Sequence, residues 1–147
     1  HTPTRRQRQM CIRDRIGDRV MLGLNGKTAF VFGVASEDSI AWAICKMLAE
    51  SGVSLYLGYQ KRFRSRIFQL KDKLPQIAGF YPLDVASDET TKEFYDAFSA
   101  DNPGKKADIM IHAIGFAPRA CFDRPILFVE DQDINTAMTI SANSLQR

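Results

Sequence analysis

Short apolar segments alternate with segments of helical periodicity along most of this 147-residue chain. The first apolar segment, residues 27–32, is nearly continuous, which is typical of a strand buried on both faces of a sheet. Three more strands are expected at 53–58, 77–83 and 109–114. Helices between consecutive strands require right-handed crossovers, which make the strands parallel. The sequence therefore predicts an α/β fold, with a doubly wound parallel sheet in a three-layer α/β/α arrangement.

The segments between the strands have apolar residues at helical spacing, which predicts helices over 39–51, 63–74, 90–100 and 134–145. Gly52 and Pro75 end the first two helices. Residues 115–133 are expected to form a loop. The side chains expected to face the core are Ile40, Ile44, Met47 and Leu48 in the first helix, Phe63, Ile67, Leu70 and Leu74 in the second, and Phe94, Ala97 and Phe98 in the third.

Positive charge is concentrated in residues 1–20, which hold six arginines against two aspartates. This net charge of +4 exceeds the +3 of the whole chain, so residues 21–147 carry −1. A basic arm for nucleic acid or anionic lipid is one interpretation, but the segment has no aromatic residue for base stacking. We favour an extraneous or disordered tail before a domain over 21–147, and we expect no nucleic-acid partner.

The sequence gives no signal for export or for membrane insertion. The tail lacks the apolar core of roughly 7–15 residues that a secretory signal needs. No segment approaches the about 20 apolar residues of a membrane helix. Cys11, Cys45 and Cys121 are too few and too scattered for a disulfide scaffold or a thiolate metal site. These features predict a cytoplasmic protein with free thiols, no metal ion and no membrane partner.

Ligands of doubly wound sheets bind at the carboxyl ends of the strands, so the residues just after each strand are the candidate site. Gly33 follows the first strand and permits a tight turn. Ser39 and Ile40 then open a helix whose free N–H groups can face a pyrophosphate. Ser39 can equally be a simple N-cap, and the two roles are compatible.

Gln60 follows the second strand, at the place where dinucleotide folds usually carry a carboxylate for the adenosine ribose. Its amide is neutral, and Lys61 and Arg62 come next, so nothing here repels a 2′-phosphate. The choice between NADH and NADPH therefore stays open. Arg64 and Arg66 are expected to lie in solvent.

Asp84 and Val85 follow the third strand, where the carboxylate can accept from an adenine amino group and the valine can pack on the ring. A plain turn role for Asp84 is an equal alternative. After the fourth strand, Ile114 can pack beside the ribose and nicotinamide, and Gly115 lets a flat ring approach the backbone. His112 lies within the strand, where a lone histidine among apolar neighbours is usually a satisfied core residue, and it is assigned no role in the site.

Four sequence elements at these strand ends, GVAS with SIA, YQ, DV and HAIGFAP, together resemble the enoyl-acyl-carrier-protein reductases of bacterial fatty acid synthesis. That family is a divergent branch of the short-chain dehydrogenases with a Rossmann fold, and the resemblance runs from about Leu24 to the end of the chain. It implies NADH-dependent reduction of the trans-2 double bond of enoyl thioesters carried on acyl carrier protein, by a homotetramer when full length.

The resemblance also implies roles for individual residues. Ala117 matches a position lining the acyl substrate pocket, and Ala113 departs from the serine that the family often has there. The NAD contacts implied are Gly33, Ser39, Ile40, Gln60, Asp84, Val85 and Ile114.

The catalytic pair of the family, Tyr-x6-Lys, is absent from this sequence. None of Tyr56, Tyr59, Tyr81 and Tyr95 has a lysine seven residues on, nor four residues on, the commoner spacing in the superfamily. We therefore expect the pair beyond Arg147, and an incomplete dinucleotide-binding domain that binds NADH weakly, reduces no enoyl thioester and dissolves poorly. Two alternatives remain: another short-chain dehydrogenase acting on ketones or alcohols, and a non-catalytic dinucleotide-binding module.

Overall fold

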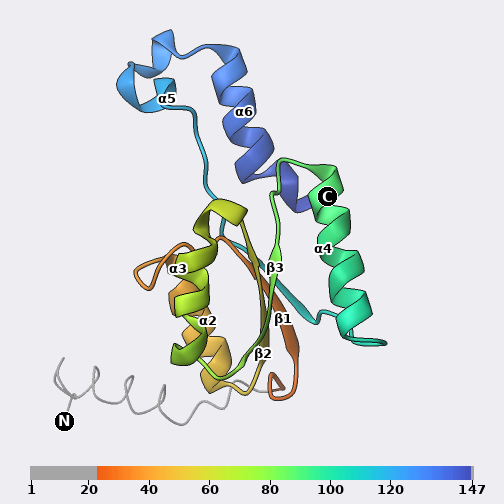
Figure 1. Ribbon diagram of the computed structural model, residues 1–147. Helices are drawn as coiled ribbons and strands as arrows, with labels where there is room; N and C mark the ends of the chain where they lie inside the picture. Colours follow the sequence, from red (N-terminus) through yellow and green to blue (C-terminus); the bar gives the residue numbers. More distant parts are fainter. Residues whose placement is uncertain (1–22, 147) are drawn as a thin grey trace, which may run out of the picture.

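The computed structural model describes residues 23–146, so the expected tail over 1–20 lies outside the described residues. A parallel four-stranded sheet forms its centre, with the strand order β3-β2-β1-β4 (Figure 1). The strands are β1 (Thr28–Phe32), β2 (Ser54–Tyr59), β3 (Ile77–Pro82) and β4 (Ile109–His112). The chain moves outward from β1 to β3 and then crosses back to place β4 on the other side of β1. The doubly wound parallel sheet is confirmed.

Helices cover both faces of this sheet. Helices α2 (Ile40–Glu50) and α3 (Arg64–Gln69) lie on one face, and α4 (Asp88–Asp101) lies on the other (Figure 1). Helices α5 (Ala120–Asp123) and α6 (Asp131–Ser141) extend beyond the carboxyl ends of the strands (Figure 1). Short 3-10 turns complete the chain: η1 (Lys61–Phe63), η2 (Lys71–Lys73), η3 (Ile126–Phe128) and η4 (Asn143–Gln146).

Two hydrophobic clusters hold the layers together. On the α2 face, the fully buried Val31, Leu55 and Leu57 pack with side chains of α2 and α3. The α4 face is aromatic: the Phe30 ring meets Phe98 edge-to-face with the ring centroids 4.7 Å apart. It meets Phe94 in the same way at 5.1 Å. Edge-to-face pairs of this kind add to the stabilisation that burial alone gives.

The expected core face of α2 is wrong in part. Ile40 and Met47 are 78% and 57% exposed, whereas Trp42 and Cys45 are buried. The reason is that this helix is apolar on nearly every side. The spacing of its apolar residues therefore does not determine which face of the helix packs against the sheet. In α4, Phe94 and Phe98 are buried as expected, but Ala97 is exposed.

Several expected boundaries also differ. The helix over 63–74 is only a short α3 between two 3-10 turns, and the loop over 115–133 contains α5 and η3. Helix α6 begins earlier than expected and ends at Ser141, where η4 replaces its last turn. Strand β4 is half-exposed rather than buried, with Met110 43% exposed, because it lies at the edge of the sheet.

The amino ends of β1 and β4 are joined by Asp108. Its Oδ2 accepts a hydrogen bond from the Thr28 amide at 2.9 Å, and its Oδ1 contacts Lys27 Nζ at 2.8 Å. The Lys27 ammonium, together with the Thr28 amide, holds the pKa of Asp108 below its usual value. These bonds fix the register of β4 beside β1, and therefore the position of the segment that follows β4.

Candidate functional site

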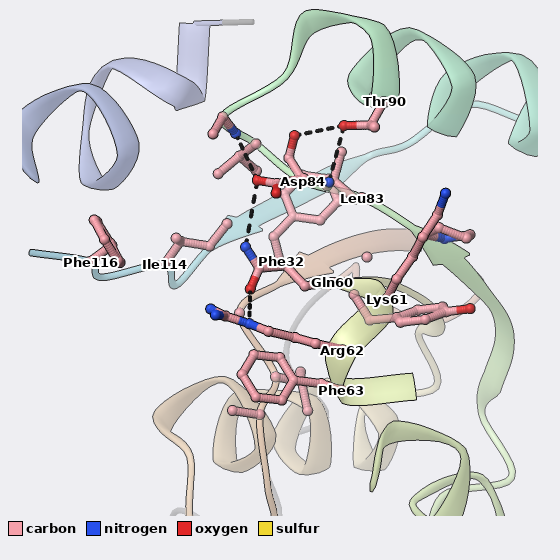
Figure 2. A pocket seen from close by; sticks show the side chains of 18 of the residues that line it. Phe32, Gln60, Lys61, Arg62, Phe63, Leu83, Asp84, Thr90, Ile114 and Phe116 are labelled. Carbon is pink, nitrogen blue, oxygen red and sulfur yellow. Dashed lines mark hydrogen bonds between the residues drawn. The ribbon is translucent and has the colours of Figure 1, made fainter. Parts of the chain in front are cut away.

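The segments that follow all four strands line one cleft of about 750 Å³ at the carboxyl end of the sheet (Figure 2). They are 33–35 after β1, 60–63 after β2, 83–86 after β3 and 113–116 after β4. The cleft spans the point between β1 and β4 where the strand order reverses. This is the place where doubly wound sheets bind their ligands.

Gly33 brings the ends of β1 and β4 into contact. Its backbone lies in the left-handed region, with a φ of 97°, and a Cβ there would stand 2.1 Å from the Ala113 carbonyl oxygen. Only glycine accepts both the conformation and the close approach. The turn that the sequence predicts at Gly33 is therefore also a junction between two walls of the cleft.

Ser39 acts as the N-cap of α2. Its Oγ accepts a hydrogen bond from the Trp42 amide at 3.2 Å and donates to the Ser36 carbonyl oxygen at 2.7 Å. Capping satisfies one of the helix's orphan N–H groups. Neither Ser39 nor Ile40 belongs to the cleft wall, so their contact with a phosphate stays a prediction.

The polar wall of the cleft is built around Gln60. Arg62 Nε donates to Gln60 Oε1 at 3.0 Å, and Gln60 Nε2 lies 3.5 Å from Asp84 Oδ1 (Figure 2). The Arg62 guanidinium also stacks over the Phe63 ring, 4.8 Å from its centroid. Gln60 thus links a cation to a carboxylate. Lys61 and Glu93 also line this cleft. Among the described residues, the positive and negative side chains that line it are therefore equal in number.

Thr90 of α4 holds Asp84 in its turn, and the strand-end reasoning did not find it. Thr90 Oγ1 donates to the Asp84 carbonyl oxygen at 2.7 Å and accepts from the Asp84 amide at 3.2 Å (Figure 2). Asp84 Oδ1 accepts from the Ala86 amide at 3.1 Å. The turn role and a ligand role for Asp84 are compatible, because the carboxylate is exposed and faces the cleft. Val85 is buried beside it.

The opposite wall of the cleft is apolar. Ile114, Gly115 and Phe116 follow β4, and α6 adds the side chain of Ile140, which no strand-end pattern predicts. A Cβ at Gly115 would meet no atom within 4 Å, so the face it leaves bare is open for a ligand ring. A planar group can therefore lie between Ile114 and the polar side chains across the cleft.

The comparisons with known proteins agree with this geometry. A sequence model of the family described as "Enoyl-(Acyl carrier protein) reductase" matches residues 33–147. The chain belongs to this family. The enoyl-[acyl-carrier-protein] reductase [NADH] of Mycolicibacterium smegmatis is 32% identical over 123 residues, covering 82% of this chain and 45% of that relative. The [NADPH] reductase of Staphylococcus aureus is 34% identical over 99 residues, 66% of this chain and 38% of the relative.

A solved structure of an enoyl-acyl-carrier-protein reductase, the Aquifex aeolicus NADH enzyme, matches with a TM-score of 0.76 and 31% identity. The match covers 84% of this chain and 53% of that one. The chain spans about half the length of the curated relatives it matches. Similarity to these reductases thus extends through nearly all of the described residues.

The contacts implied by the enoyl reductase resemblance fall into two groups. Those that the structure brings together in the cleft are Gly33, Gln60, Asp84, Val85 and Ile114. Ala117 lies outside the cleft wall, as do Ser39 and Ile40. Ala113, where the family often has serine, packs its methyl group against the core on the α2 face, and its amide donates to the Phe32 carbonyl oxygen at 3.0 Å.

Other candidate groups lie away from the cleft. The Arg64 guanidinium stacks over Phe68, 5.4 Å from the ring centroid. His112 Nε2 contacts Ser144 Oγ at 2.8 Å. Within residues 23–146, no three His, Cys, Asp or Glu side chains gather closely enough to hold a metal ion. No helix in this part of the chain has the length and apolar character needed to cross a membrane.

Proposed function

We propose that the described residues form the NADH-binding part of an enoyl-acyl-carrier-protein reductase. One observation carries the proposal: the segments after all four strands meet in a single cleft at the switch point of the sheet. Relatives of this chain are named for NADH, and they match it over most of its length. We also propose an enoyl thioester on acyl carrier protein as the substrate, a homotetramer as the full-length assembly and the cytoplasm as its compartment.

The two walls of the cleft give the cofactor an orientation. Asp84 and Val85 would receive the adenine, through one carboxylate acceptor and one apolar surface. Gln60 would meet the adenosine ribose, because an amide can both donate to and accept from hydroxyl groups. Ile114 and the bare face of Gly115 would carry the nicotinamide and its ribose. When bound, NADH would supply a hydride for the β-carbon of an enoyl group.

NADPH is the second candidate cofactor. Lys61 and Arg62 line the cleft beside Gln60, and Arg62 uses its Nε on Gln60, which leaves the terminal guanidinium nitrogens to meet a phosphate. The Staphylococcus aureus relatives are named for NADPH. Comparing the two affinities decides the question. Tighter binding of NADPH that is lost in Arg62→Ala would assign Arg62 to the 2′-phosphate.

Reduction also requires a donor for the negative charge that develops on the thioester oxygen. The sequence contains no tyrosine with a lysine at either family spacing. Lys105 Nζ does donate to Tyr56 Oη at 2.9 Å, but neither residue lines the cleft. We therefore propose that these 147 residues alone bind the cofactor without reducing an enoyl thioester, as a non-catalytic dinucleotide-binding module would.

Titration of the purified 147-residue chain with NADH, followed by calorimetry, tests the proposal. Asp84→Ala should weaken binding several-fold, because it removes the acceptor at the adenine end. Asp72→Ala changes an exposed aspartate outside the cleft and should leave the affinity unchanged. Absence of NADH binding by folded protein would overturn the cofactor assignment. Turnover of a crotonyl thioester would overturn the statement that the chain is not catalytic.

A further inference from the structure

The end of α6 is bonded back to the segment that follows β4. Ser141 Oγ accepts a hydrogen bond from the Phe116 amide at 2.9 Å and donates to the Phe116 carbonyl oxygen at 2.9 Å. A hydroxyl has one proton and two lone pairs, so a single serine can make both bonds at once. Both backbone groups of Phe116 are thereby held by one side chain, 25 residues further along the chain.

A second contact ties the same region to β4 itself. Ser144 Oγ donates to the Ile140 carbonyl oxygen at 2.7 Å, which uses its only proton. The same Oγ lies 2.8 Å from His112 Nε2, and donation by this ring nitrogen to the hydroxyl satisfies both groups. Ser144 is only 7% exposed. This contact gives the His112 ring a hydrogen-bond partner, as is usual for a histidine among apolar neighbours.

These two contacts flank the apolar wall of the cleft. His112 precedes and Phe116 ends the segment 113–116, and every residue of that segment lines the cleft. Gly115 has no side chain that could pack against its surroundings, so the position of this segment depends on its neighbours. Helix α6 supplies those neighbours, and its Ile140 lines the same wall.

We propose that Ser141 is a positioning residue for the cofactor. It fixes the Phe116 backbone, and with it the wall formed by Ile114 and Gly115, before the cofactor enters. This inference rests on the proposed function, because it assumes that the nicotinamide end of NADH lies against that wall. The ligand itself need not touch the Ser141 hydroxyl, since that hydroxyl is engaged with Phe116.

The proposal predicts that loss of the Ser141 hydroxyl changes the affinity for NADH but not the affinity for ADP. Without the Ser141 hydroxyl, the wall after β4 becomes mobile, and NADH should bind about tenfold more weakly because ordering that wall then falls to the ligand. ADP, which would occupy only the Gln60 and Asp84 side, should bind with unchanged affinity. A general loss of folding would weaken both ligands together.

The test compares Ser141→Ala, Ser141→Thr and Thr136→Val in NADH and ADP titrations of the full chain. Ser141→Thr keeps the hydroxyl and should restore NADH affinity. Thr136→Val removes a hydroxyl that, among residues 23–146, donates to the Gln132 carbonyl oxygen of its own helix at 2.8 Å, and it should change neither affinity. Unchanged NADH affinity in Ser141→Ala, parallel loss of ADP affinity, or failure of Ser141→Thr to restore binding would overturn the proposal.

Hydrogen exchange in the unsubstituted chain gives a measurement that needs no variant. The Phe116 amide should exchange at least tenfold more slowly than an unstructured amide when no ligand is present, because Ser141 accepts from it. Exchange at the unstructured rate would show that Ser141 does not hold the Phe116 backbone. Protection of this amide in a chain that binds neither NADH nor ADP would instead confirm the contact between Ser141 and Phe116 and refute the proposed function.

Discussion

Substituting Gly33 by alanine should damage the cleft more than any comparable change at a turn. The left-handed backbone of Gly33 costs an L-residue about 1–2 kcal/mol. A Cβ would also stand 2.1 Å from the Ala113 carbonyl oxygen, whereas carbon–oxygen contacts normally begin at about 3.3 Å. The ends of β1 and β4 must therefore separate by roughly 1 Å. We expect about 3 kcal/mol of destabilisation, a fall in Tm of roughly 10 °C, and NADH binding weakened more than tenfold.

A matched variant separates the steric contact from the backbone conformation. Gly104 has a similar φ of 74°, but a Cβ there would meet no atom within 4 Å. Gly104→Ala should therefore lose only about 1–2 kcal/mol and should keep its NADH affinity. Thermal unfolding followed by circular dichroism and calorimetric titration measure both quantities. Equal loss of stability in the two variants, or unchanged NADH binding in Gly33→Ala, would refute the reasoning.

Two further predictions follow from ionisable groups. The folded pKa of Asp108 lies below its unfolded value, so its stabilisation is present above about pH 4 and is lost as the pH falls through the folded pKa. In Asp108→Asn the free energy of unfolding should accordingly decline less between pH 5 and pH 2 than in the unsubstituted chain. An equal decline in both proteins would contradict this. Burial raises the pKa of the Cys45 thiol to about 12. A chain with Cys11→Ser and Cys121→Ser should therefore resist a thiol reagent at pH 8 until denaturant unfolds it, whereas rapid labelling of the native protein would show that the thiol is accessible.

The strands and the cleft could be predicted because both depend on local sequence. Continuous apolar segments mark parallel strands, and the first residues after them, such as Gln60 and Asp84, must gather at one edge of the sheet. The inward face of α2 could not be predicted in the same way. Its sequence is apolar almost all round, and only packing against Leu55 and Leu57 selects Trp42 over Met47.

The supporting residues of the site were beyond sequence reasoning for a different reason. Thr90 and Ser141 hold segments that lie 6 and 25 residues away, and no local pattern distinguishes them from other hydroxyl residues on helices. The sequence predicts a turn at Gly33, but the contact of Gly33 with the Ala113 carbonyl joins two strands that are distant in sequence. Such contacts exist only once the chain has folded.

The order of the strands has a consequence for how the molecule assembles. Each step from β1 to β2 to β3 joins neighbours in the chain, whereas the pairing of Ala29 with Ile109 closes a far longer loop. Because long loops close at a greater entropic cost, β4 is expected to dock last and to detach first. A nucleotide lodged between the ends of β1 and β4 would then select the finished sheet over its three-stranded precursor. Ligand binding and the last step of folding would then both depend on the junction between β1 and β4.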